Sequence, residues 1–530
     1  MYIKNRDIKM KSLNKKIRLN ILIIMADQLS ALALSCYGNK VVKTPNIDKL
    51  AKNGIVFENN YSTCPLCVPS RASLLSGNLP SKIEVYDNGA EFKASIPTFV
   101  HFLRSEGYYT CSAGKMHFIG PDQLHGFEDR VTTEIYPADF SWTSNWETDA
   151  RFVKSNEVSS IDSALDADAY AWNMQMDYDE EVFYQGRRQI YEIARVDKKN
   201  PFLLFISFSH PHDPFITTKK YWNLYNDDEI DMPKVPPIPL EEQDPHSRYL
   251  YEMYNMDKIT NILDIKNARH GYYSMISYID EKIGKLLKAL EETGLDKNTV
   301  VIFTSDHGEM LGERGMWYKK TFFESSIRVP FIFNFPLMFK PGRVTKNTSL
   351  VDIMPTILDI CNCNIDNYKN VLDLDGHTLL DVINGNSNNW DNIAYAEQTD
   401  SGTLAPRLMV KKNKYKYVWS EAYPPLLYNL YNDPHELKNL SGLSEYKELG
   451  NMMFSLIQQK WDTKNIKDKI IKHQKKSILV SNALSKGRIT YWEIGSTVNF
   501  ARGYVRYGSK FPDVDRDCYV PYKTINRRNK

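Results

Sequence analysis

The sequence contains no apolar run long enough to cross a membrane or to form the hydrophobic core of a signal peptide. Its first strong apolar run covers residues 21–26 and is followed at once by Asp27, with no small-residue cleavage site. A membrane-spanning helix needs about 20 apolar residues, and the core of a signal peptide needs about 7 to 15. We therefore expect a protein that neither enters a membrane nor is exported, and whose location is cytoplasmic.

A surplus of charge of either sign is also missing. The chain has 67 lysines and arginines against 65 acidic residues, which gives a formal net charge of +2. Nucleic-acid binding relies on a concentrated basic surface, so this balance offers no support for such a partner. Basic residues do gather in the first 18 residues and near the end of the chain, where we interpret them as solvated termini.

Cysteine is scarce, with seven residues in 530. An odd number in a long chain without a signal peptide predicts free thiols in a reducing compartment rather than a disulfide framework. Cys64 and Cys67 have the spacing of a Cys-x-x-Cys pair, which leaves thiol redox chemistry or half of a zinc site as alternatives. No second pair lies at zinc spacing, and neither alternative explains the Pro-Ser-Arg sequence that follows.

The chain does contain a regular alternation of strand and helix signals through its first two thirds. Continuous apolar runs at residues 20–26, 202–208 and 299–304 are typical of buried parallel strands, and helical signals lie between them. This pattern predicts an α/β fold with a large mixed, mostly parallel sheet sandwiched by helices, and the length calls for more than one domain. The predicted parts are a basic N-terminal extension (1–18), a large catalytic domain (19–385), a small C-terminal sheet-plus-helix domain (386–470) and a C-terminal tail that makes oligomer contacts (471–530).

Polar and ionisable residues follow the predicted strands. They are Asp27-Gln28, Lys115-Met116-His117, the segment from His210 to Asp213, and Asp306-His307-Gly308. In an open parallel sheet the carboxyl ends of the strands share one edge, where ligands collect. We therefore expect these four segments to converge on one site.

The most informative segment runs from Cys67 through Pro69, Ser70 and Arg71 to Gly77. A cysteine that opens a helix lies where backbone N–H groups favour an anion, and an arginine one turn later faces the same anion. The Cys-x-Pro-Ser-Arg and Leu-Leu-Ser-Gly elements resemble the signature of the formylglycine-dependent sulfatases of the alkaline phosphatase superfamily. The resemblance implies that Cys67 becomes formylglycine (3-oxoalanine), whose hydrate attacks a sulfate ester to give a sulfated-enzyme intermediate. The alternative is a cysteine beside a helix start with a capping serine.

The same resemblance implies a divalent metal between two of the strand ends. Asp27 and Gln28 offer two oxygen ligands, Asp306 and His307 offer a carboxylate and an imidazole, and Cys67 completes the expected set. Hard oxygen donors favour Ca²⁺, with Mn²⁺ or Mg²⁺ as alternatives, over zinc. The family usually has two aspartates at the first pair, and glutamine there resembles the choline-sulfatase and phosphonate-monoester-hydrolase branch. Taken alone, an aspartate at a strand end is more often a cap or a turn former.

Fixed positive charge for the sulfate oxygens is expected from Arg71, Lys115 and Lys319. Lys115 and His117 match the Lys-x-His element of the sulfatases, and Lys319 stands where the family has its second lysine. His212 resembles the histidine beside the leaving group, and an imidazole near neutrality suits the protonation of an alkoxide. Without the resemblance, a lone lysine is usually solvated surface, and His212 is a satisfied side chain in a proline-rich turn.

Resemblance to the choline-sulfatase branch extends over nearly the whole chain and tapers after about residue 450. A quaternary ammonium ion has no N–H to donate, so aromatic faces and a nearby carboxylate hold it. Trp142 and Trp146, one helical turn apart, would form two walls of such a cage, although a tryptophan pair at this spacing is more often core. The branch often has Glu where this chain has Ser401. The expected substrate-binding residues are Asn88, Trp142, Trp146, Glu397 and Asp400.

The resemblance thus implies a cytoplasmic enzyme that hydrolyses choline O-sulfate to choline and sulfate. A formylglycine-generating or radical maturation enzyme is an expected partner, as is a second copy of the chain in a homo-oligomer, either a dimer or a tetramer. No nucleic-acid or membrane partner is expected. Two alternatives stay open. A phosphonate monoester or phosphodiester hydrolase of the same superfamily would keep the metal and Cys67 without the tryptophan pair, and a catalytically silent binding protein would never mature Cys67.

Overall fold

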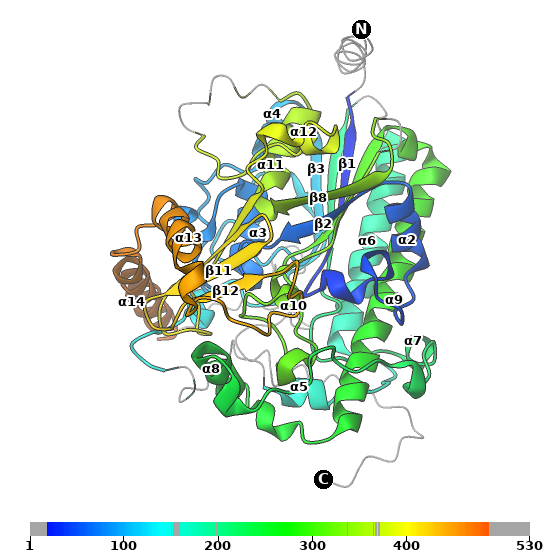
Figure 1. Ribbon diagram of the computed structural model, residues 1–530. Coiled ribbons are helices and arrows are strands. Elements are labelled where there is room, and N and C mark those ends of the chain that lie inside the picture. The colour runs from blue at the N-terminus through cyan, green and yellow to red at the C-terminus, as the bar shows by residue number, and fades with distance from the viewer. Residues whose placement is uncertain are drawn as a thin grey trace.

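The computed structural model describes residues 18–149, 151, 160–196, 200–335, 338–363, 365, 368 and 372–486. They form a large domain around an eight-stranded sheet and a smaller domain around a four-stranded sheet (Figure 1). Nearly all of the predicted N-terminal extension, and the predicted tail from residue 487 onward, lie outside the described residues. Within the part of the chain that is described, every helix is too short or too polar to cross a membrane.

The large sheet has the strand order β4-β3-β5-β1-β6-β7-β2-β8, and of these strands β7 alone runs against its neighbours. Three central strands are the predicted apolar runs, and all of their residues are buried, as expected when helices cover both faces. The predicted mostly parallel sheet is therefore confirmed. Its strands are β1 (Asn20–Ala26), β2 (Ile55–Tyr61), β3 (Tyr109–Gly114), β4 (Asp129–Arg130), β5 (Phe202–Phe208), β6 (Thr299–Ser305), β7 (Phe331–Asn334) and β8 (Gly342–Ser349).

Helices cover both faces of this sheet (Figure 1). The sheet separates two hydrophobic cores, one on each face. Successive side chains of a strand point to opposite faces, so Leu22 and Ile24 pack in one core, whereas Ile21 and Ile23 pack in the other. The first core is covered by α6 (Met174–Val196) and α9 (Ile262–Thr293). The second is covered by α3 (Cys67–Ser76), α4 (Phe99–Ser105) and α11 (Ile353–Ile360). Shorter helices are α2 (Pro45–Lys52), α5 (Asp162–Leu165), α7 (Lys219–Trp222), α8 (Pro245–Met253), α10 (Glu324–Ile327) and α12 (Leu380–Ile383).

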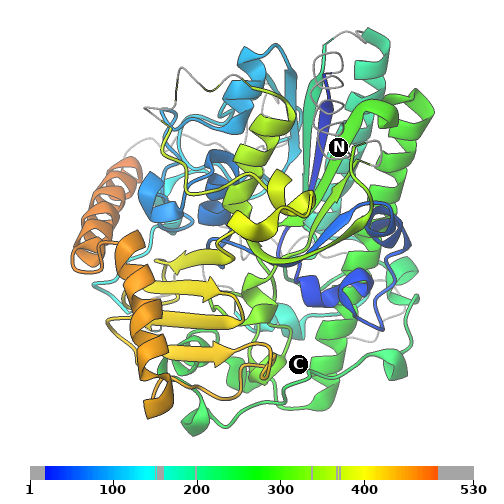
Figure 2. The same ribbon diagram turned by 45° about the horizontal axis from the view of Figure 1, so that its top comes forward.

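The smaller domain is an antiparallel sheet covered by a helix (Figure 2). Its strands are β9 (Ile393–Gln398), β10 (Arg407–Lys412), β11 (Tyr415–Ser420) and β12 (Leu426–Asn429). Helix α13 (Lys447–Lys460) buries Met453 and Ile457 in one cluster with Leu408 and Val410 of the sheet. Helix α14 (Ile466–Leu484) follows, so the predicted domain boundary at residue 470 falls inside a helix.

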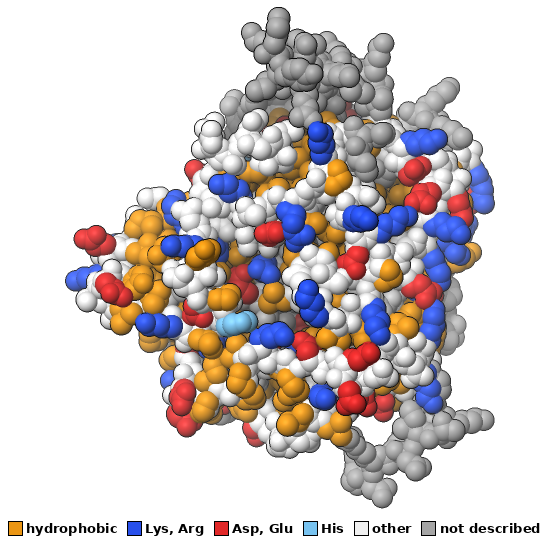
Figure 3. All heavy atoms as spheres, turned by 45° about the vertical axis from the view of Figure 1, so that its right-hand side comes forward, with side chains coloured by type: hydrophobic (Ala, Val, Ile, Leu, Met, Phe, Trp, Pro, Cys, Tyr) orange, Lys and Arg blue, Asp and Glu red, His pale blue; other side chains and the backbone are white. Residues whose placement is uncertain are grey.

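Charges of both signs are mixed on at least one face of the molecule. Figure 3 shows one face of the molecule, on which lysine and arginine side chains are interspersed with aspartate and glutamate.

Candidate active site

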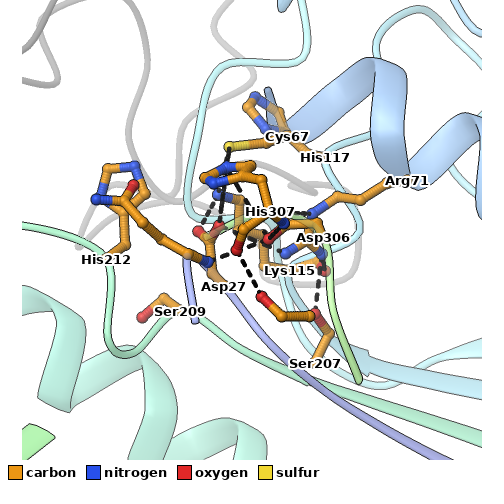
Figure 4. A network of polar contacts seen from close by, with 12 residues as sticks. Asp27, Cys67, Arg71, Lys115, His117, Ser207, Ser209, His212, Asp306 and His307 are labelled. Atoms are coloured by element: carbon orange, nitrogen blue, oxygen red, sulfur yellow. Dashed lines mark hydrogen bonds and ion pairs between the residues drawn. The ribbon is translucent and has the colours of Figure 1, made fainter. Parts of the chain in front are cut away.

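Four strand ends of the large sheet meet at one site (Figure 4). Strands β3, β5, β1 and β6 are parallel neighbours, so the residues that follow them lie together. Cys67, from the start of α3, lies at the centre. Its Sγ is 3.2 Å from His307 Nε2, 3.5 Å from Lys115 Nζ and 3.7 Å from Asp27 Oδ1. Lys319 Nζ is 3.9 Å from the same sulfur atom.

Cys67 is buried, and its burial disfavours the thiolate form. The side-chain oxygen of Asn88 accepts a hydrogen bond from the N–H of Val68 (3.0 Å), which satisfies a donor in the first turn of α3. Burial raises the pKa of the Cys67 thiol to about 11. The thiolate is the nucleophilic form of cysteine, so burial of Cys67 disfavours the thiol redox alternative. Cys64 and Cys67 are both free in the structure.

Four side chains of the site have the arrangement of metal ligands. One ligand atom each from Asp27, Cys67, Asp306 and His307 lies within 4.8 Å of the others, and all four residues are buried. His307 donates from Nδ1 to the carbonyl oxygen of Gly308 (3.1 Å), so its Nε2 is the acceptor that faces the cluster. Burial lowers the pKa of His307 to about 4, which keeps the ring neutral, as a metal ligand must be. Two carboxylates and a neutral imidazole fit the expected divalent ion.

Gln28 turns its amide oxygen toward the same cluster. Its Nε2 group donates to Asp213 (3.2 Å) and to Glu309 (2.6 Å), and its Oε1 accepts a hydrogen bond from Lys319. Because two carboxylates hold the NH₂ group, the amide orientation is determined, and it is the one that a ligand role of Gln28 requires. Asp213 belongs to a segment that was expected to converge on the site, although no role was predicted for it, whereas Glu309, two positions after His307, was not among the expected site residues.

Three buried cations, Arg71, Lys115 and Lys319, lie beside the carboxylates. Arg71 donates through Nε to Asp306 (2.7 Å), and the ammonium group of Lys115 contacts Asp27. Burial by itself raises the pKa of the Asp27 carboxyl, but the three cations outweigh it and hold this pKa well below the usual range. The site therefore keeps ionised carboxylates next to fixed positive charge, which suits the binding of a metal cation together with an anion.

His212 and Lys319 form a pair beside the cluster. The Lys319 ammonium donates to Nε2 of His212 (2.6 Å), whose Nδ1 donates to the carbonyl oxygen of Asp213 (2.8 Å). Burial and the neighbouring ammonium lower the pKa of His212 well below its usual value, so the ring is neutral. In this pair the proton between the two nitrogen atoms is carried by Lys319 rather than by the imidazole.

An aromatic wall stands next to these cations. The ammonium of Lys115 lies 4.2 Å from the centre of the Tyr136 ring. That ring also packs against His117, Trp142 and His212, with ring centres 5.2, 5.6 and 5.6 Å away. Tyr136 thus links the predicted residues His117 and Trp142 to the cluster. No motif or periodicity marks this tyrosine in the sequence, so only the fold could identify it.

Trp146 and Asp400 lie together where the two domains meet. The indole Nε1 of Trp146 donates to the backbone carbonyl oxygen of Asp400 (2.8 Å), and its backbone N–H donates to Gln474 of α14 (3.0 Å). The Asp400 carboxylate is 2.9 Å from the ammonium group of Lys320. The predicted carboxylate partner of a substrate cation is therefore already paired with a lysine.

Glu397 connects separate parts of the fold. One of its oxygens accepts a hydrogen bond from the backbone N–H of Ser81, and the other accepts from the indole Nε1 of Trp461 (2.6 Å). Both oxygens thus have donors within the protein, which is a structural role. The substrate role of Glu397 stays a prediction that this geometry does not support.

Glu397→Gln is expected to change how stability depends on pH. Burial raises the pKa of Glu397 to about 7 in the folded protein, from an ordinary value of 4.5. The folded state therefore binds this proton more tightly, so the contribution of Glu397 to stability is full below the ordinary pKa and is lost as the pH rises to about 7. The shift corresponds to about 3 kcal/mol at most. Urea unfolding of the wild type and of the variant, at about pH 5 and about pH 8, measures how the free energy of unfolding changes with pH. Glu58→Gln, at a half-exposed carboxylate, is the control, and an unchanged pH dependence in Glu397→Gln would contradict the expectation.

Comparisons with known proteins agree with this site. The chain matches the sulfatase family over residues 19–363, and the C-terminal domain of N-sulphoglucosamine sulphohydrolase over residues 312–463. It is 40% identical to a choline-sulfatase of Rhizobium meliloti (strain 1021) over 430 residues, which are 80% of this chain and 82% of that protein. It is 31% identical to an arylsulfatase of Clostridium perfringens over 81% of this chain and 91% of that one.

The fold is shared with solved structures of other hydrolases. A phosphonate monoester hydrolase of Agrobacterium radiobacter superposes with a TM-score of 0.67 at 23% identity, over 84% of this chain and 96% of that one. At that identity the likeness shows the fold alone. The family match covers well over half of the chain and includes every residue of the cluster around Cys67. The protein therefore belongs to the sulfatase family and is a sulfuric ester hydrolase.

Proposed function

We propose that this sulfatase hydrolyses choline O-sulfate to choline and sulfate. The observation that carries the proposal is the aromatic wall of Tyr136 and Trp142 beside the cluster around Cys67. Aromatic faces next to a sulfate site offer what a trimethylammonium group requires, since that group has no N–H to donate. The choline-sulfatase relative, at 40% identity, supports the same substrate.

In this proposal the cations of the cluster position the sulfate group. Arg71 and Lys115 are held in place by Asp306 and Asp27 and would bind the non-bridging oxygens. The pair of Lys319 and His212 would protonate the departing alkoxide. Formylglycine derived from Cys67 would supply the attacking hydroxyl group, and a bound divalent metal would add Lewis-acid polarisation.

The cofactors follow from the donor set. We propose Ca²⁺ as the metal because Asp27, Gln28 and Asp306 offer hard oxygen ligands, with Mn²⁺ or Mg²⁺ as alternatives. Formylglycine at position 67 requires a maturation enzyme of the formylglycine-generating or radical type. The cytoplasmic location and the dimeric or tetrameric assembly stay predictions.

Kinetics of the matured enzyme on choline O-sulfate and on an aryl phosphonate diester test the proposed function. We expect choline O-sulfate to have the higher kcat/KM, by about 100-fold or more. Slow hydrolysis of choline O-sulfate with fast hydrolysis of the phosphonate would favour the phosphonate-hydrolase alternative. No turnover of either substrate, with Cys67 still a thiol, would favour a silent binding protein.

Trp146→Ala is expected to lower kcat/KM for choline O-sulfate about 3- to 30-fold, because an aromatic face contributes about 0.5–2 kcal/mol to a desolvated quaternary ammonium ion. An aryl sulfate carries no such cation and should lose less than about threefold. Steady-state kinetics on both substrates measure the difference. Trp419→Ala removes another indole from the same hydrophobic cluster and is the matched control. Equal losses on both substrates in Trp146→Ala would show that Trp146 is core.

A further inference from the structure

A buried ion pair lies next to the site. Lys320 follows Lys319 in the chain and is 2% exposed, and Asp400 is completely buried. The Lys320 ammonium is 2.9 Å from Oδ2 of Asp400 and donates to the hydroxyl oxygen of Ser401 (2.8 Å). The other carboxylate oxygen, Oδ1, accepts from the backbone N–H of Gly402 (3.0 Å). Each oxygen of the Asp400 carboxylate thus has a partner inside the protein.

The pair is held in place from several sides. The backbone N–H of Lys320 donates to the carbonyl oxygen of Pro65 (3.2 Å), in the segment that leads into α3. Its aliphatic stem packs on Gly402, where an added Cβ atom would lie 2.7 Å from Lys320 Cδ. The carbonyl oxygen of Asp400 accepts the indole N–H of Trp146 (2.8 Å). The ion pair therefore connects the segment before α3 to an indole that is proposed to contact the substrate cation.

The electrostatic potentials of the Lys320 ammonium and the Asp400 carboxylate largely cancel at a group that binds nearby. A lone buried carboxylate attracts a cationic leaving group, whereas a carboxylate with an ammonium 2.9 Å away presents a dipole, whose potential falls off faster with distance. We propose that Lys320 is a specificity-determining residue that removes the charge preference Asp400 would otherwise create. The leaving group is then selected by its shape and by aromatic contacts. This inference rests on the proposed hydrolysis of choline O-sulfate and extends the substrates to uncharged, branched alkyl sulfates.

The test compares choline O-sulfate with its uncharged isostere, dimethylbutyl sulfate, in which a quaternary carbon replaces the nitrogen. The ratio of the two kcat/KM values measures the charge preference, because a change in the sulfate chemistry affects both substrates alike. Aromatic contacts alone can favour the cationic substrate by up to about 30-fold. We therefore expect the kcat/KM of the wild-type enzyme for choline O-sulfate to exceed that for the isostere by no more than this factor.

Two single variants should move this ratio in opposite directions. Lys320→Met keeps the length of the side chain and leaves Asp400 uncompensated, so the ratio should rise about tenfold or more. Asp400→Asn leaves Lys320 uncompensated, so the ratio should fall about threefold or more. The double variant should lie within about twofold of the wild type. Lys285→Met, at an exposed lysine of α9, makes the same change in net charge and should leave the ratio unchanged.

A ratio within about twofold of the wild type in both single variants, with folding verified by circular dichroism, would overturn the inference. An uncompensated buried carboxylate destabilises a protein, and if Lys320→Met does not fold, Asp400→Asn decides alone. Failure of the proposed function looks different, because the wild-type enzyme would then hydrolyse neither substrate while still hydrolysing an aryl sulfate.

Discussion

Replacing Cys67 with alanine is expected to abolish hydrolysis of sulfate esters, with a loss of about 10⁴-fold or more in kcat. The Cys67 sulfur lies among His307, Lys115 and Asp27 at distances of 3.2–3.7 Å, where a nucleophile formed from this residue would meet the sulfate group. Alanine removes a single heavy atom and is a good helix former, so α3 and the surrounding charges should stay in place. Steady-state kinetics on choline O-sulfate and on an aryl sulfate measure the loss.

Cys64→Ala is the matched control, because Cys64 is also buried, free and close to the start of α3. Its activity should stay within about tenfold of the wild type. A loss as large as that of Cys67→Ala would instead indicate that the two thiols act together. The mass of the peptide that contains residue 67 is a second measurement, since formylglycine is about 18 Da lighter than cysteine. An active enzyme with an unmodified Cys67, or an active Cys67→Ala variant, would place the nucleophile elsewhere.

Asp27→Asn is expected to lower turnover about 10³-fold or more and to release the bound metal. Asp27 is completely buried, lies within 4.8 Å of the ligand atoms of Asp306 and His307, and contacts Lys115. Asparagine keeps the shape of the side chain but removes the charge that balances Lys115. The site would then hold one anionic ligand fewer and an excess of positive charge, which disfavours a divalent cation. Metal content per subunit after dialysis, measured by elemental mass spectrometry, reports on binding independently of activity.

Asp179→Asn is the matched control for this experiment. Asp179 is also a completely buried carboxylate, and it accepts from Nδ1 of His210 (2.6 Å) and from the backbone N–H of Ser209 (2.8 Å). The variant should lose stability by about 1–3 kcal/mol but keep its metal. If Asp27→Asn retains both metal and turnover, the metal is bound by other residues. In the wild-type enzyme, a chelator should abolish activity and Ca²⁺ should restore it.

Much of the fold and many members of the site could be predicted from local patterns. Strands β1, β5 and β6 are continuous apolar runs, and their length and burial mark them as central strands. Asp27 and Asp306 could be placed at one site because they follow parallel strands, whose carboxyl ends share an edge. Cys67 and Arg71 are one helical turn apart, so a short motif identifies them. Each of these signals lies within a few residues of chain.

The pairing of buried polar groups could not be predicted in this way. Glu309, 281 positions from Gln28, helps to determine which way the amide of Gln28 points. Lys320 lies 80 positions before Asp400 in the chain. It forms an ion pair with the Asp400 carboxylate, which was expected to contact the substrate cation.

The sequence by itself thus determined the family, the sheet and most of the residues that gather around Cys67, because short motifs and strand periodicity are local. Only the tertiary structure decided the orientation of Gln28, the place of Tyr136 and the partner of Asp400. A buried charge or amide must find a partner, and the packing of distant segments decides which partner that is.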